Sequence, residues 1–116
     1  MEDRRSLERL RPYYYLRVYD DGGDDYVGSV VDISLKGIRM VGEGEFHIAK
    51  KYTFTMKLPE GSFFGESVTV AAECRWCRQN GDDGSFETGF RFKKDVHQGV
   101  FTIKGIIDDL RSRKMI

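Results

Sequence analysis

The sequence predicts a mostly β fold: an antiparallel barrel or sandwich of six short strands, followed by one α-helix. Six segments alternate apolar and polar residues with a period of two, which is typical of strands with one buried face. Turn sequences rich in Gly, Asp and Pro separate these segments at fairly regular spacing. The C-terminal stretch instead repeats its apolar residues every three or four positions, as an amphipathic helix does.

The strands follow from this alternation in chain order. In the first, Leu16 and Val18 share one face while Arg17 and Tyr19 share the other. A hairpin turn with two glycines follows at 20–25. In the fourth, Phe54 lies on the apolar face, and we assign it to the core rather than to a surface for stacking bases. The six predicted strands are 13–19, 26–33, 37–41, 51–58, 68–77 and 86–92.

The tail predicts a helix over residues 95–113. Asp95 and Gln98 have the spacing of a capping box at its start. Gly99 and Gly105 each cost about 1 kcal/mol relative to Ala inside a helix, so this helix is expected to depend on docking against the barrel. The apolar stripe consists of Val96, Val100, Ile103, Ile107 and Leu110.

Length and composition indicate one globular domain. The chain has 116 residues, 40% of them hydrophobic and 33% charged. Lys plus Arg equals Asp plus Glu at 19 each, which argues against a general DNA- or RNA-binding protein. The charged N-terminus and the short apolar runs predict a cytoplasmic protein with no signal peptide and no membrane insertion. We divide the domain into an arm (1–12), a barrel (13–94) and the helix (95–113).

The sequence shows no enzyme signature, and we expect neither catalysis nor a metal or cofactor. It lacks a G-x-S-x-G motif, a phosphate loop and a His-rich metal pattern. Cys74 and Cys77 form a C-x-x-C, but on an extended strand they lie on opposite faces with Cα atoms about 10 Å apart, beyond disulfide reach. We therefore predict a core Cys74 and a surface Cys77; a turn beginning at Trp76 would weaken that argument.

Two polar features remain unexplained by the fold. Asp32, Ser34 and Gly37 form a D-x-S-x-x-G turn between two apolar runs, where Asp and Ser bond to nearby backbone N–H groups and Gly permits a tight bend or a close approach. The first eleven residues carry several arginines and few apolar residues, which predicts a basic, mobile arm.

These two features together resemble a PilZ domain. Arg4, Arg5 and Arg9 form R-R-x-x-x-R, and 22 residues separate Arg9 from the D-x-S-x-x-G motif. The segment Thr88–Phe92 (T-G-F-R-F) is similar to a strand ending common in the family. The resemblance covers essentially the whole chain and implies a bacterial stand-alone member with a six-stranded antiparallel β-barrel of split-barrel type and a C-terminal helix.

The resemblance also implies that the chain binds cyclic di-GMP. Guanine presents O6 and N7 acceptors that a guanidinium meets with two parallel N–H donors, and arginine also suits the phosphodiesters. Trp76 either stacks on a guanine or is a core aromatic on the same strand face as Cys74, and the sequence leaves both open. The implied ligand contacts are Arg4, Arg5, Arg9, Asp32, Ser34, Gly37 and Trp76.

Three functions are compatible with this pattern. In the first, cyclic di-GMP binding orders the arm and signals to an unidentified protein partner. In the second, the chain is a PilZ-like adaptor that binds a protein and no nucleotide; Tyr13, Tyr15 and Tyr19 share a face with Arg17 and form a candidate partner surface. Binding of single-stranded nucleic acid is disfavoured by the neutral net charge.

Overall fold

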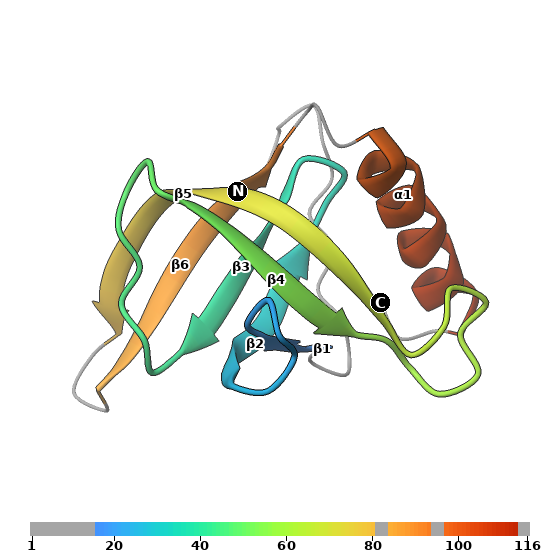
Figure 1. The fold of residues 1–116 in the computed structure, drawn as a ribbon, viewed down its shortest axis with the longest axis horizontal. Helices are drawn as coiled ribbons and strands as arrows, with labels where there is room; N and C mark the ends of the chain where they lie inside the picture. Colours follow the sequence, from blue (N-terminus) through green and yellow to red (C-terminus); the bar gives the residue numbers. More distant parts are fainter. Residues whose placement is uncertain (1–15, 81–83, 94–96, 114–116) are drawn as a thin grey trace.

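The computed structural model describes residues 16–80, 84–93 and 97–113, and it confirms the predicted fold class (Figure 1). Six antiparallel strands close into a barrel in the order β1-β2-β3-β6-β5-β4. One helix, α1 (His97–Ser112), follows the last strand. The strands are β1 (Leu16–Tyr19), β2 (Tyr26–Ile33), β3 (Gly37–Gly42), β4 (Lys51–Lys57), β5 (Ser67–Asn80) and β6 (Ser85–Phe92).

The strand boundaries agree closely with those predicted, and β5 differs most. It continues to Asn80, which pairs with Ser85 of β6, so the hairpin between the two strands is longer than the predicted 68–77 and 86–92. Of the first predicted strand, residues 13–15 lie outside the described part of the chain, as do the arm, Tyr13, Tyr15 and the capping residue Asp95. The division of the domain into arm, barrel and helix stays a prediction.

The barrel interior holds the apolar faces that the alternation predicts. Phe54 and Phe90 are 3% and 4% exposed, and their rings meet edge to face with centroids 5.0 Å apart. Phe92 is half-buried against the same core. The strand residues that are almost completely buried are Val18, Val30, Ile33, Met40, Met56, Ala72, Cys74 and Thr88.

Helix α1 lies beside the connection between β4 and β5 (Figure 1). Its residues Ile103, Ile107 and Leu110 are buried as predicted, and they join the same core as the strands. Gly105 faces Phe64 from the β4–β5 connection, and a Cβ at Gly105 would overlap the Phe64 ring. The glycine that weakens the isolated helix therefore makes room for the ring that docks it.

The strand pairing is irregular at three places: one lies between β1 and β2, and the other two are bulges in β2 and in β5. In β2, Val30 pairs with Met40 and Asp32 pairs with Arg39, so one extra residue is inserted between the two pairs. In β5, Cys74 pairs with Phe90 and Trp76 pairs with Gly89, with Arg75 as the extra residue. A bulge shifts the parity of every residue beyond it, which redirects side chains to the opposite face of the sheet.

Candidate functional site

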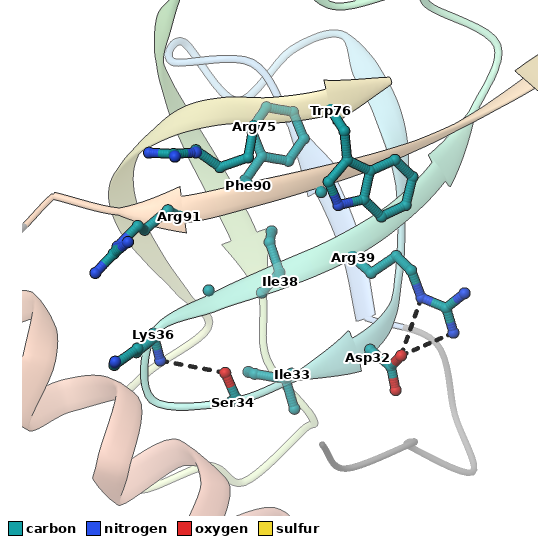
Figure 2. Close-up of a pocket in the computed structure, with 12 residues that line it drawn as sticks. Asp32, Ile33, Ser34, Lys36, Ile38, Arg39, Arg75, Trp76, Phe90 and Arg91 are labelled. Atoms are coloured by element: carbon teal, nitrogen blue, oxygen red, sulfur yellow. Dashed lines mark hydrogen bonds and ion pairs between the residues drawn. The ribbon is translucent and has the colours of Figure 1, made fainter. Parts of the chain in front are cut away.

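The two bulges lie next to the same pocket on the outer face of the barrel (Figure 2). The pocket has a volume of about 220 Å³, and its walls come from β2, β3, β5 and β6. Four of the sequence-predicted site residues line it: Asp32, Ser34, Gly37 and Trp76. The other three, Arg4, Arg5 and Arg9, lie outside the described residues.

The turn between β2 and β3 is shaped by its serine and glycine. The backbone N–H of Ser34 donates to the carbonyl of Gly37 at 2.9 Å, and the Ser34 hydroxyl accepts from the N–H of Lys36 at 3.2 Å. A Cβ at Gly37 would overlap the carbonyl of Phe90 on the adjacent strand. The glycine is thus required for close packing of β3 against β6, independently of any ligand.

Asp32 anchors a chain of charged groups across the outer face. The bulge in β2 turns Asp32 outward, where it is only 3% exposed and its Oδ2 accepts from Nε of Arg39 at 2.9 Å; Nη2 of Arg39 lies 2.7 Å from the same oxygen (Figure 2). Nη1 of Arg39 pairs with Glu87 of β6. The other oxygen of Glu87 accepts from Nε and Nη2 of Arg78 on β5, at 3.2 and 2.9 Å.

Glu87 is the buried centre of this network. Its exposed fraction is 7%, and burial by itself raises the pKa of a carboxyl group. The hydrogen bonds and positive charges of Arg78 and Arg39 outweigh that burial, so the pKa of Glu87 lies below its ordinary value. Glu87 is therefore ionised at neutral pH and holds both guanidinium groups in place.

Trp76 owes its position to the bulge in β5 and to the glycine opposite. In a regular strand Trp76 would lie on the same face as Cys74, inside the core. The extra residue, Arg75, reverses the alternation, so the indole lies on the outer face. A Cβ at Gly89 would overlap the indole, so only glycine leaves room for the ring over β6. The guanidinium carbon of Arg78 lies 5.4 Å from the centre of the indole.

The same bulge changes the prediction for the two cysteines. Cys74 is fully buried as predicted, and burial raises the pKa of its thiol. Cys77, predicted as a surface thiol, is half-buried against the core, and its sulfur lies 3.2 Å from the Thr88 hydroxyl. That prediction was wrong because it assumed unbroken alternation, whereas the extra residue, Arg75, turns Cys77 back toward the interior.

Several residues of the site were not singled out from the sequence. Arg39 and Arg91 lie on outward-facing positions of strands that were correctly predicted, so alternation alone marks them as exposed but gives them no role. Gly89 belongs to the T-G-F-R-F segment, which was noted only as a family feature. Nothing in the sequence indicates a role for Glu87 in the site, because a lone acidic residue in a strand is ordinarily exposed to solvent. The pocket lining brings Arg39, Gly89 and Arg91 together, and Glu87 joins them through its ion pair with Arg39.

The sequence matches the PilZ domain model over residues 3–102. The chain belongs to the PilZ domain family. It matches none of the curated proteins with which it was compared. The family model spans both predicted motifs, the arginine segment and the D-x-S-x-x-G turn.

Solved PilZ-containing structures share the fold. The PilZ domain of YcgR from Escherichia coli, solved with c-di-GMP, aligns with a TM-score of 0.69 at 15% identity, covering 97% of this chain and 95% of that chain. The MrkH–c-di-GMP complex of K. pneumonia aligns with a TM-score of 0.70 at 18% identity, covering 97% of this chain and 55% of that chain. The Bacillus subtilis inhibitor of motility MotI aligns with a TM-score of 0.69 at 16% identity, covering 97% of this chain and 52% of that chain. This PilZ chain spans about half the length of MotI and MrkH.

Within residues 16–80, 84–93 and 97–113, no group of three or more His, Cys, Asp or Glu side chains is arranged to hold a metal ion. No helix in the same part of the chain is long and apolar enough to cross a bilayer. PilZ domains are binding domains, so the pocket is a candidate ligand site.

Proposed function

We propose that this chain is a receptor for cyclic di-GMP, the ligand in the solved YcgR and MrkH complexes. The observation that carries the proposal is that Asp32, Ser34 and Gly37 of the turn line one pocket together with Trp76, which is distant in the sequence. Membership of the PilZ family supports the same function.

The pocket chemistry suits part of a guanine nucleotide. Asp32 and Arg39 line the pocket as a carboxylate and a guanidinium, the types of group that pair with base edges, and Trp76 offers an aromatic ring to stack on. Pockets that enclose whole ligands have volumes of about 300–1,000 Å³. Since this one measures about 220 Å³, it suits one base with an adjoining phosphate, and the rest of the dinucleotide extends beyond it.

The remaining contacts are assigned to the N-terminal segment. In this proposal Arg4, Arg5 and Arg9 meet guanine edges and phosphates, for which lysine would be a poor substitute. Their engagement fixes segment 1–12 against the barrel and changes the surface that a protein partner meets. No cofactor and no catalytic step is part of the proposal.

Calorimetric titration with cyclic di-GMP tests the receptor function. We expect the wild type to bind, and Arg5→Ala and Asp32→Ala each to weaken binding by about 10-fold or more, because a charged hydrogen-bonding group on the ligand loses its partner. Lys57→Ala is the control, since Lys57 is exposed on β4 away from the pocket. A folded wild type that gives no binding heat would refute the receptor function.

That negative result would favour the second candidate, a PilZ adaptor that binds a protein and no nucleotide. A specific observation supports it: a largely apolar pocket of about 710 Å³ lies on the outer side of β2 and β3, lined by Tyr26, Val31 and Val41 among others. The guanidinium carbon of Arg17 lies 5.7 Å from the centre of the Tyr26 ring, and the rings of Tyr19 and Tyr26 meet edge to face. Of the predicted partner surface, Tyr19 and Arg17 are therefore adjacent to this pocket.

A further inference from the structure

Strand register arranges the outer face around the pocket in rows. Gly37 of β3 pairs with Arg91 of β6, and Arg39 pairs with Gly89 one row further along. In a regular strand, only one residue of β5 would face outward in the row of Gly89. The bulge places Arg75 and Trp76 next to each other there, and both line the pocket. The bulge thus brings a cation and an aromatic residue, adjacent in the chain, to the same pocket.

Three cations of the pocket lie on the side away from Trp76. Figure 2 shows the side chains of Lys36, Arg75 and Arg91 directed to one side, with Trp76, Arg39 and Asp32 on the other. Gly37 and Gly89 also line the pocket and contribute no side chains to it. We call Lys36, Arg75 and Arg91 the cationic edge.

The cationic edge differs from the other basic residues of the site. Arg39 and Arg78 are both engaged by Glu87, whereas within the described part of the chain no ion pair involves a member of the cationic edge. All three members are exposed. Glu73 pairs with Arg91 across the β5–β6 ladder, and among the ion pairs of the described residues none joins Glu73 to the cationic edge. Their positive charge is therefore available to a ligand.

We propose that Lys36, Arg75 and Arg91 bind a phosphodiester of the cyclic dinucleotide whose base stacks on Trp76. The inference rests on the proposed receptor function and deepens it by assigning phosphate contacts to the barrel itself. Guanidinium groups bind phosphate oxygens with paired N–H donors, and an ammonium adds a compact charge. Figure 2 shows Trp76 and the cationic edge on opposite sides of the pocket, so a ligand that stacks on the indole extends across the pocket toward the three cations.

The test compares two double variants that remove the same charge. Arg75→Gln with Arg91→Gln neutralises the edge, and Arg17→Gln with Lys57→Gln neutralises two exposed cations on β1 and β4, which lie elsewhere on the barrel. Calorimetric titration with cyclic di-GMP is run at two salt concentrations, with thermal melts to verify folding. We expect the edge variant to bind about 10-fold more weakly and with less dependence on salt, and the matched variant to bind as the wild type does.

Charge reversal sharpens the outcome. Arg75→Glu should weaken binding more than Arg75→Gln does, because a carboxylate repels the phosphate, whereas a merely steric contact would not distinguish the two substitutions. If the wild type binds and the edge variant matches the control variant in affinity and salt dependence, the phosphate assignment is overturned and the receptor function stands. If the wild type binds no cyclic di-GMP, both are overturned.

Discussion

Replacement of Glu87 by glutamine removes the charge at the centre of the Asp32–Arg39–Glu87–Arg78 network with almost no change in side-chain size. Glu87 is 7% exposed and accepts hydrogen bonds from two guanidinium groups. Glutamine keeps one acceptor oxygen but turns an NH₂ group toward the remaining guanidinium donors. We expect Glu87→Gln to destabilise the fold and to loosen Arg78 over the indole of Trp76.

The magnitude follows from how far each partner is buried. The side chain of Arg78 is 68% exposed, so its pair with Glu87 contributes at most about 1 kcal/mol. That of Arg39 is 23% exposed, and a hydrogen bond between such charged groups contributes about 1.5–3 kcal/mol. We expect a loss of about 2–3 kcal/mol, which at about 4 °C per kcal/mol for a domain of 116 residues lowers the melting temperature by about 10 °C.

The pH dependence identifies the charge as the cause. The pKa of Glu87 is lowered in the folded protein, so its contribution to stability is fully present above its ordinary value of 4.5 and is lost as the pH falls through the folded-state pKa. The difference in unfolding free energy between wild type and Glu87→Gln should therefore be largest near neutral pH. It should shrink below pH 4.5, where protonated Glu87 comes to resemble glutamine.

Urea unfolding followed by fluorescence suits this test, because Trp76 is the single tryptophan of the chain. Arg78→Gln is the control and should lose no more than about 1 kcal/mol, since only the exposed pair is removed. A Glu87→Gln protein as stable as the wild type, or a stability difference that stays constant from pH 7 to pH 3, would refute the reasoning.

Two further predictions concern glycine contacts. Gly89→Ala displaces the indole of Trp76, so fluorescence titration should show weaker cyclic di-GMP binding with little loss of stability. The control is Gly44→Ala, where an added Cβ meets open space, and this variant should bind as the wild type does. Equal affinities of the two variants would contradict the stacking role of Trp76. Phe64→Ala undocks α1 and should lower the unfolding free energy by about 1–3 kcal/mol, less than for a fully buried ring. Phe63 is 89% exposed, so Phe63→Ala should leave the unfolding free energy unchanged. If Phe63→Ala and Phe64→Ala lower it equally in urea unfolding, the contact of Phe64 with Gly105 is unimportant for docking.

The fold class could be predicted from the sequence because hydrophobic burial imposes a regular period on every element. Leu16, Val18 and Phe54 are buried as their alternation requires, and Ile103 and Leu110 are buried as the helical period requires. The D-x-S-x-x-G turn was also recognisable, because serine and glycine act there through contacts with residues close in sequence or on the adjacent strand.

The positions of Asp32, Trp76 and Cys77 were decided by the tertiary structure. Each lies at or beyond an inserted residue, and one extra residue reverses the face on which every later side chain lies. A bulge is selected by the packing of two paired strands, so the alternation within one strand does not reveal it. The sequence by itself determined a six-stranded fold with a polar turn; only strand pairing determined that Asp32, Arg39, Glu87 and Trp76 meet on one outer face, because those contacts join residues distant along the chain.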